Sequence, residues 1–203
     1  MIQSKEDYIF YLEADRLSLG ITKKTPSFLY GDEIWKFERL LRKIEYYKNC
    51  KKGIFWKLYL YWLKWQFHHL SVKLSYYIPP NVCGPGLSLH FHVVAINEAA
   101  IIGANCRIHT GVNIARQGGE SGSGPKLGDN VYIGPGVKIF GDIIIADGIA
   151  IGANAVVNKS FLEPGISIGG IPAKKISEKG SEGLIIRGTE LADVTLKSRK
   201  NLL

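Results

Sequence analysis

The sequence predicts a mainly β protein, a parallel β-helix with an α-helical N-terminal region. Three observations lead to this fold class. Aliphatic residues recur every six residues through the middle of the chain, glycine is abundant with 23 among 203 residues, and the six-residue period begins only after Pro79 and Pro80. Neither an α-helix nor a flat strand keeps a six-residue repeat with small residues at fixed places, whereas a coil of short strands does.

The six-residue repeat defines the β-helical part of the chain. In such a coil the aliphatic residue fills the interior, and the small or turn-tolerant residue after it turns the corner. Each step is six residues, except one of thirteen between Ile114 and Leu127. We expect Ile102, Ile133 and Ile151 in particular to point inward. The aliphatic positions are Ile96, Ile102, Ile108, Ile114, Leu127, Ile133, Ile139, Ile145, Ile151 and Val157.

The N-terminal 78 residues are predicted to form three helices. Ser4-Lys5-Glu6-Asp7 resembles a capping box that opens a short helix ending near Gly20. A second helix should begin near Asp32, because apolar residues then recur at helical spacing. A third, over about residues 54–70, is dense in Trp and Tyr. Such residues fit a membrane surface or packing between helices or subunits, and packing is their commoner use.

These patterns divide the chain into three parts. We expect a helical region at residues 1–78, a β-helix domain at 79–176 and a C-terminal tail at 177–203. The end of the tail, from Glu182 onward, combines short apolar runs with charges. This pattern fits a strand laid over a neighbour or plain disorder.

The positive charge is concentrated in the helical region. Net charge is +8, and residues 1–78 carry 14 Lys and Arg against 8 Asp and Glu. Because no nucleic-acid motif accompanies this excess, we expect charged faces of amphipathic helices and no nucleic-acid partner. The cysteines lack metal-like spacing, and the N-terminus carries no secretory signal. We therefore expect a reduced, cytoplasmic protein with no metal and no stable membrane insertion.

Several stretches carry a resemblance to a known family. Ile133-Gly134-Pro135-Gly136-Val137-Lys138 and Ile151-Gly152-Ala153-Asn154-Ala155-Val156 resemble hexads of the left-handed β-helix acyltransferases. Gly169-Gly170-Ile171-Pro172-Ala173-Lys174 resembles the motif that closes their last coil. The resemblance covers about residues 78–176. It implies a left-handed coil, acetyl-CoA as acyl donor, and a homotrimer or dimer of trimers.

Other stretches are similar to one branch of that family. Residues 81–90 and 105–114 resemble the serine acetyltransferases, including members associated with bacterial surface polysaccharide. Ile34-Trp35-Lys36-Phe37 is similar to a segment of their helical N-terminal region. The resemblance implies an O-acetyltransferase whose acceptor is a small hydroxyl compound, with a polysaccharide sugar slightly favoured over L-serine. The alternative is a non-catalytic β-helix that acts as a scaffold or partner-binding subunit.

The resemblance implies a histidine base in the strand that follows Gly86 and Leu87. An imidazole with a pKa near 6.5 can take a hydroxyl proton at neutral pH. His90 and His92 are both candidates, and alignment back from Asn97 favours His90, although two plain surface histidines are the alternative. His109, at a corner position, would either orient the acceptor or cap a turn.

The resemblance also implies a site for CoA. The corresponding positions are Ala153, Asn158, Lys159 and Lys174. Small residues such as Gly134 and Ala153 would let the cofactor reach backbone N–H groups. The two lysines would meet phosphate as point charges, or else are simply solvated at coil corners.

Two positions depart from the serine acetyltransferase pattern. Gly124 stands where those enzymes have a second histidine, and Tyr77 stands where they have an aspartate, which puts serine as acceptor in doubt. The Gly-rich segment 116–125 explains the thirteen-residue step, because one residue more than two hexads must bulge from the coil. We expect this bulge to lie beside the base and form a wall of the acceptor site.

Overall fold

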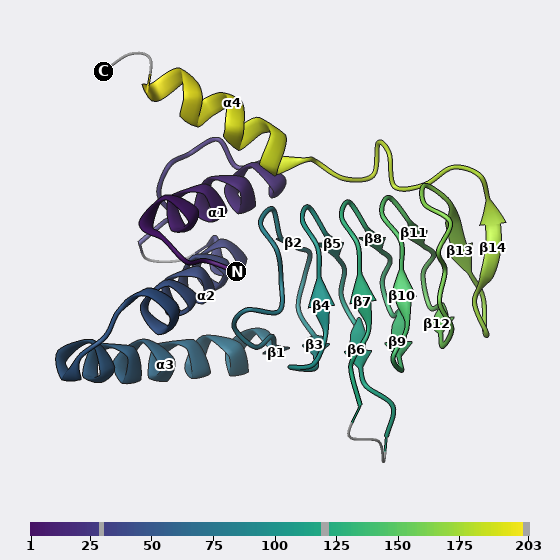
Figure 1. Ribbon diagram of the computed structural model, residues 1–203, viewed down its shortest axis with the longest axis horizontal. Helices are drawn as coiled ribbons and strands as arrows, with labels where there is room; N and C mark the ends of the chain where they lie inside the picture. The colour runs from purple at the N-terminus through teal and green to yellow at the C-terminus, as the bar shows by residue number, and fades with distance from the viewer. Residues whose placement is uncertain (29–30, 119–121, 201–203) are drawn as a thin grey trace.

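The computed structural model describes residues 1–28, 31–118 and 122–200. Helices gather at one end of the molecule and a β-helix extends from them (Figure 1). The helices are α1 (Lys5–Ser18), α2 (Glu33–Cys50), α3 (Ile54–Leu74) and α4 (Gly188–Lys200). None of these described helices has the length and apolar character needed to cross a bilayer.

The N-terminal helices form where the sequence predicts them. The Ser4 hydroxyl accepts from the Asp7 N–H at 2.9 Å, and the Asp7 carboxylate accepts from the Ser4 N–H at 3.0 Å, so the capping box is confirmed. α2 follows Asp32 and buries Phe37 and Leu41 on its inner face. α3 continues to Leu74, four residues beyond its predicted end.

The β-helix consists of three sheets, each made from one side of every coil. Sheet A has the order β1-β3-β6-β9-β12, sheet B the order β10-β7-β4, and sheet C the order β14-β13-β11-β8-β5-β2. All pairs are parallel except β13 with β14. The strands are β1 (Tyr76–Tyr77), β2 (Ser88–Leu89), β3 (Val94–Ile96), β4 (Ile101–Ile102), β5 (Arg107–Ile108), β6 (Asn113–Ala115), β7 (Lys126–Leu127), β8 (Tyr132–Ile133), β9 (Lys138–Phe140), β10 (Ile144–Ile145), β11 (Ala150–Ile151), β12 (Val156–Val157), β13 (Ser167–Gly169) and β14 (Lys174–Ser177).

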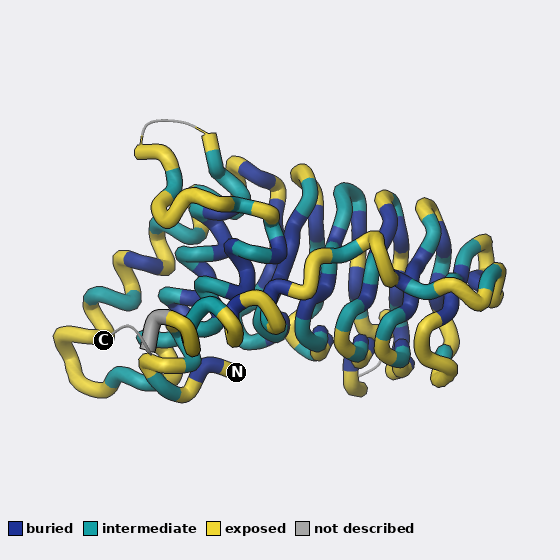
Figure 2. Tube along the Cα trace, turned by 90° about the horizontal axis from the view of Figure 1, so that it is seen from above, coloured by how far each residue is buried: buried dark blue, intermediate teal, exposed yellow. Residues whose placement is uncertain are grey.

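The six-residue repeat forms the core of this left-handed parallel β-helix. All ten predicted aliphatic positions are buried, none more than 4 % exposed. Ile108, Ile133 and Ile151 stack directly on one another through the strand register. Figure 2 shows the buried residues repeating from coil to coil. The prediction of fold class is confirmed.

Residues in the left-handed region turn the corners of the coil. Where sheet B leads into sheet C, Gly86, Asn105, Asn130, Gly148 and Gly165 have φ between +54° and +78°. This conformation clashes with a Cβ in most residues, and glycine and asparagine tolerate it best. The corners therefore explain much of the glycine in the middle of the chain.

Carboxylates from the helices cover the open end of the β-helix. The first coil has no earlier coil to receive its backbone N–H groups, and a buried unpaired N–H is costly. The Leu87 N–H donates to Asp15 at 2.9 Å, the Asn81 N–H to Glu45 at 2.7 Å and the Leu89 N–H to Glu38 at 3.0 Å. The three carboxylates are buried, and burial raises the pKa of Glu38 well above its usual range.

Arg42 completes this cap, because it bonds both to carboxylates of the helices and to backbone carbonyls of the first coil. Its guanidinium pairs with Asp15 at 2.7 Å and with Glu45 at 3.0 Å. It also donates to the carbonyls of Cys83 at 2.8 Å and Gly84 at 2.6 Å. The expectation that the charges of the helical region lie on solvated faces is thus wrong for Arg42 and the three carboxylates. These buried charges join the helices to the first coil.

The described part of the C-terminal tail ends in the helix α4, so the expectation of a strand or disorder from Glu182 onward is wrong there. It runs back along the B-to-C corner from the far end of the β-helix (Figure 1). On the way, the Ser181 hydroxyl donates to the Asn130 carbonyl. α4 then packs on α1, where the Gly188 N–H donates to the Ser18 hydroxyl at 3.2 Å. Contacts with coils distant in sequence hold the tail in place.

Candidate active site

The C-to-A corner, where strands of sheet C lead into sheet A, aligns the predicted histidines in a column. The strand register pairs Leu89 with Ile108, then Ile133, then Ile151. The residue after each is His90, His109, Gly134 and Gly152 in turn. Coils of a parallel sheet lie about 4.8 Å apart. The column thus begins with two imidazoles and continues as a surface without side chains.

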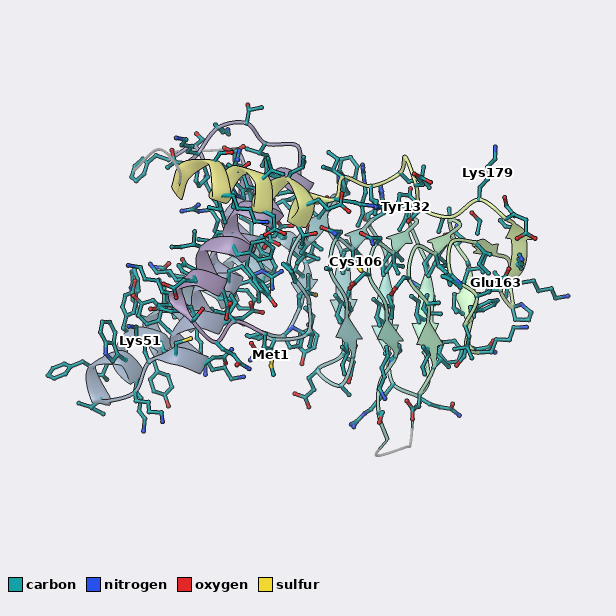
Figure 3. The ribbon with its side chains drawn as sticks, turned by 45° about the horizontal axis from the view of Figure 1, so that its top comes forward. Met1, Lys51, Cys106, Tyr132, Glu163 and Lys179 are labelled. Carbon is teal, nitrogen blue, oxygen red and sulfur yellow. The ribbon has the colours of Figure 1, made fainter. Side chains whose placement is uncertain are left out.

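The two imidazoles of this column lie against each other. The rings of His90 and His109 stack with centroids 5.1 Å apart and an interplanar angle of 18°. Nε2 of His90 lies 3.0 Å from the hydroxyl of Ser88, which fixes the ring orientation. The ring of Tyr132, which Figure 3 labels on the next coil, lies 5.2 Å from that of His109. Ser88 and Tyr132 are not among the site residues that the sequence predicts.

The surroundings favour neutral imidazoles. Burial lowers the pKa of His90 to about 4, and the nearby charges of Arg107 and His109 act in the same direction. The pKa of His109 is lowered by burial and by Arg107. Nε2 of His109 is buried and has no hydrogen-bond partner among the described residues. At neutral pH both rings can therefore accept a proton or a hydrogen bond.

His92 does not join this pair. Its side chain is exposed, and its backbone carbonyl accepts from the Thr110 hydroxyl. An open groove of about 350 Å³ runs between the start of α2 and the first coil, and both His90 and His92 border it. Trp35 and the carboxylate-bearing Glu33 line the opposite side.

The backbone after His90 is strained. Five residues separate Leu89 from Ala95, whereas four separate their register partners in the next coil. Phe91 and Val93 both adopt positive φ, at +64° and +68°. A β-branched residue such as valine rarely does so, and such strain clusters at functional sites. The hydroxyl of buried Tyr76 donates to the Phe91 carbonyl and holds this bulge in place.

The predicted cofactor-binding residues are divided between two corners. Gly134 and Ala153 lie at the C-to-A corner, in the coils that follow the histidines. Asn158 and Lys159 follow β12 and lie at the A-to-B corner, where both are exposed. Lys174 is exposed on β14, paired with Gly169 at the end of the histidine column. One chain does not bring all five residues together.

The Gly-rich loop also leaves from the A-to-B corner. It follows β6, whereas His90 follows β2 at the C-to-A corner. The expectation that the loop lies beside the base is therefore wrong within one chain, and its residues 119–121 lie outside the described residues. Of the two departures, Tyr77 is exposed on β1, and Gly124 packs tightly on the backbone of Ala99.

Gly134 is needed by the coil itself. It is buried, and a Cβ there would lie 2.8 Å from the Ile151 carbonyl oxygen and 2.9 Å from the Ala153 nitrogen. We expect Gly134→Ala to lower the free energy of unfolding by about 1–3 kcal/mol, as overpacking does. Gly118→Ala is the control, because a Cβ at Gly118 meets open space. Urea unfolding that shows equal stability for both variants would contradict this close packing.

This fold is shared with a known class of enzymes. A left-handed β-helix of hexads, closed by an antiparallel strand, is the fold of the hexapeptide-repeat acyltransferases. The relatives and structural neighbours of this chain are named serine acetyltransferases.

Curated relatives match a little under half of the chain. The serine acetyltransferase of Synechococcus elongatus is 36 % identical over 99 residues, which are 48 % of this chain and 40 % of the relative. That of Staphylococcus epidermidis is 40 % identical over 88 residues, 43 % of this chain and 41 % of the relative. The chain thus matches about two fifths of the length of these relatives. No family model matches the chain.

Solved structures match over a longer span. Serine acetyltransferase from Brucella abortus has a TM-score of 0.65 at 26 % identity, covering 87 % of this chain and 71 % of that chain. The Neisseria gonorrhoeae enzyme in complex with serine has a TM-score of 0.65 at 26 % identity, covering 86 % and 71 %. The Brucella abortus enzyme in complex with coenzyme A has a TM-score of 0.62 at 26 % identity, covering 86 % and 68 %. The likeness therefore extends beyond the β-helix into the helices.

Proposed function

We propose that this chain is an acetyl-CoA-dependent O-acetyltransferase with His90 as its general base. The observation that carries the proposal is the pair of neutral, half-buried imidazoles at the head of a column that ends beside Lys174. The relatives are named serine acetyltransferases, and one neighbour was solved with coenzyme A. A scaffold that had lost the chemistry would not need two neutral imidazoles stacked side by side.

His90 would move one proton in each direction. Acetyl-CoA supplies an activated thioester. His90 takes the proton of the acceptor hydroxyl as that oxygen forms its bond to the acetyl carbon, and then returns the proton to the leaving sulfur. The Ser88 hydroxyl holds the His90 ring, and His109, which stacks on that ring, would orient the acceptor. His92 borders the groove and contributes by position only.

The two separate corners support a site shared between subunits. In a ring with threefold symmetry, the C-to-A corner of one chain can face the A-to-B corner of its neighbour. Gly134, Ala153 and Lys174 would then meet Asn158 and Lys159 of the partner across one CoA groove. We therefore propose a homotrimer, or a dimer of trimers, as the active form.

The acceptor is proposed to be a sugar hydroxyl, with L-serine as the alternative. The names of the relatives favour serine. The absence of a histidine at Gly124 and of an aspartate at Tyr77 favours a different acceptor. The groove beside His90 is compatible with either acceptor, since the Glu33 carboxylate on its border can accept from vicinal sugar hydroxyls or from an ammonium group.

The decisive experiment measures thiol release from acetyl-CoA with a panel of sugars, nucleotide sugars and L-serine. Thiol release that depends on an acceptor, with the acetyl ester found in the product, is the expected result. Binding of CoA with no release for any acceptor would overturn the proposal and favour the scaffold.

Lys174 tests the cofactor end of the column. Lys174→Ala should weaken CoA binding by roughly 1–3 kcal/mol if the phosphate contact is charge-assisted, and by less at high salt. Lys175→Ala is a matched control, because Lys175 already pairs with Glu163 at 2.6 Å and Glu178 at 2.8 Å. Calorimetry that finds equal affinities for both variants would return Lys174 to the role of a solvated lysine.

A further inference from the structure

One side of α3 exposes a row of large apolar side chains. Trp62 and Trp65 are 50 % and 61 % exposed, and Phe55 and Leu58 are 82 % and 61 % exposed. Their spacing places them on one face of the helix, together with Tyr61 and Val72. We call these six residues the outer α3 face. It runs along a helix of 21 residues, about 31 Å long.

The opposite side of α3 is packed in the usual way. Leu63 and Leu74 are buried, and the ring of Phe67 stacks on that of Phe37 in α2 at 4.9 Å. Packing on α2 therefore uses one face and leaves the second apolar face open. An ordinary surface helix is polar on the side away from the core. α3 thus departs from that pattern, and its aromatic residues exceed what internal packing requires.

The charges along this face are all positive. Lys57 and Lys64 are exposed at its edge, and the sequence of α3 contains no Asp or Glu. Lys51 and Lys52 precede the helix, and Figure 3 shows Lys51 at the outer end of the helical region. Pairing this face with the same face of a second copy would bring lysines together without partners. An anionic partner satisfies both the apolar row and its lysines.

We propose that the outer α3 face binds the surface of an anionic phospholipid bilayer. Trp, Tyr and Leu enter the boundary between headgroups and acyl chains, and lysines at the edge reach lipid phosphates. The helix then lies parallel to the membrane, with α2 behind it. This membrane contact is separate from the proposed acetyl transfer, and each can fail without the other.

The test is flotation of the whole chain with vesicles. Phosphatidylcholine vesicles containing phosphatidylglycerol should carry the protein upward, and pure phosphatidylcholine vesicles should carry much less. Tryptophan fluorescence should shift to the blue on binding, because three of the four tryptophans lie on α3. The triple variant Leu58→Ser, Trp62→Ser, Trp65→Ser should lose about tenfold or more in vesicle affinity.

Two further variants isolate the charge and control for exposure. Lys57→Gln with Lys64→Gln should weaken binding to anionic vesicles by about fivefold per lysine, and this loss should disappear at high salt. Leu162→Ser with Val194→Ser removes exposed apolar side chains elsewhere and should leave vesicle binding unchanged. Circular dichroism of each variant confirms that the fold is kept.

Two results would overturn the proposal. One is wild-type protein that stays at the bottom of the gradient with anionic vesicles. The other is a triple variant that binds vesicles as well as the wild type does. If vesicles are not bound and light scattering shows that the triple variant has a smaller oligomer than the wild type, the outer α3 face is a contact between copies.

Discussion

Replacing His90 by alanine is expected to lower kcat by about 10²–10⁴, the usual contribution of a positioned general base. CoA binding should stay intact, because the column that ends at Lys174 is unchanged. The loss falls on kcat because the imidazole acts on the acceptor proton as the new bond forms. His92→Ala should cost much less, since that side chain lies outside the stacked pair.

The comparison of these two variants also tests the register of the strained turn. Loss of turnover in His92→Ala with full activity in His90→Ala would show that His92 is the base. If neither change affects turnover on an identified acceptor, neither His90 nor His92 is the general base. Steady-state rates with saturating acetyl-CoA are the measurement.

The pH profile gives an independent check on His90. Its pKa is lowered to about 4, so the ring is already neutral well below pH 7. The value of kcat/KM should stay level across neutral pH and fall as the pH drops toward 4. Because the folded pKa lies below the unfolded value near 6.5, this group also weakens the fold as pH falls from about 6.5 toward 4. Circular dichroism at each pH separates protonation from unfolding. A fall in kcat/KM already near pH 6.5 would contradict the buried environment of His90.

Arg42→Met is expected to lower the free energy of unfolding by about 3–5 kcal/mol, as does removal of one partner from a buried ion pair. Asp15 and Glu45 would be left as buried carboxylates without their cation. The carbonyls of Cys83 and Gly84 would lose their donor as well. The helices should then separate from the first coil, or the whole chain should unfold.

The pH dependence of this variant has a definite sign. Burial already raises the pKa of Asp15, and the Arg42 guanidinium opposes that rise. Without Arg42 the folded pKa rises further, so the destabilisation should grow as pH increases above the unfolded value near 4. Arg39→Met is the control on the same helix, since Arg39 is only half-buried and stacks on Trp35 at 5.5 Å. Urea unfolding that finds a loss below about 1 kcal/mol for Arg42→Met would contradict the role of the cap.

The β-helix was predictable because its rule is local and repeated. Every hexad places one aliphatic side chain inside and one small residue at the corner, so the sequence repeats the same evidence ten times. The start of α1 was predictable for a similar reason, since its capping box lies within four residues. His109 was predicted from its corner position in the repeat, whereas His90 was predicted only from the family resemblance, and the strand register then places each one residue after a buried aliphatic residue.

Contacts between distant parts of the chain were decided only by the tertiary structure. Arg42, Asp15 and Glu45 look like ordinary charges of amphipathic helices, and only the unpaired backbone of the first coil makes them a buried cap. The tail becomes α4 because α1 offers a surface for it, which its own sequence does not state. The sequence alone determined the coil and the residue types at its corners. Which corners face one another, and which charges leave water, depends on packing energies between segments far apart in sequence.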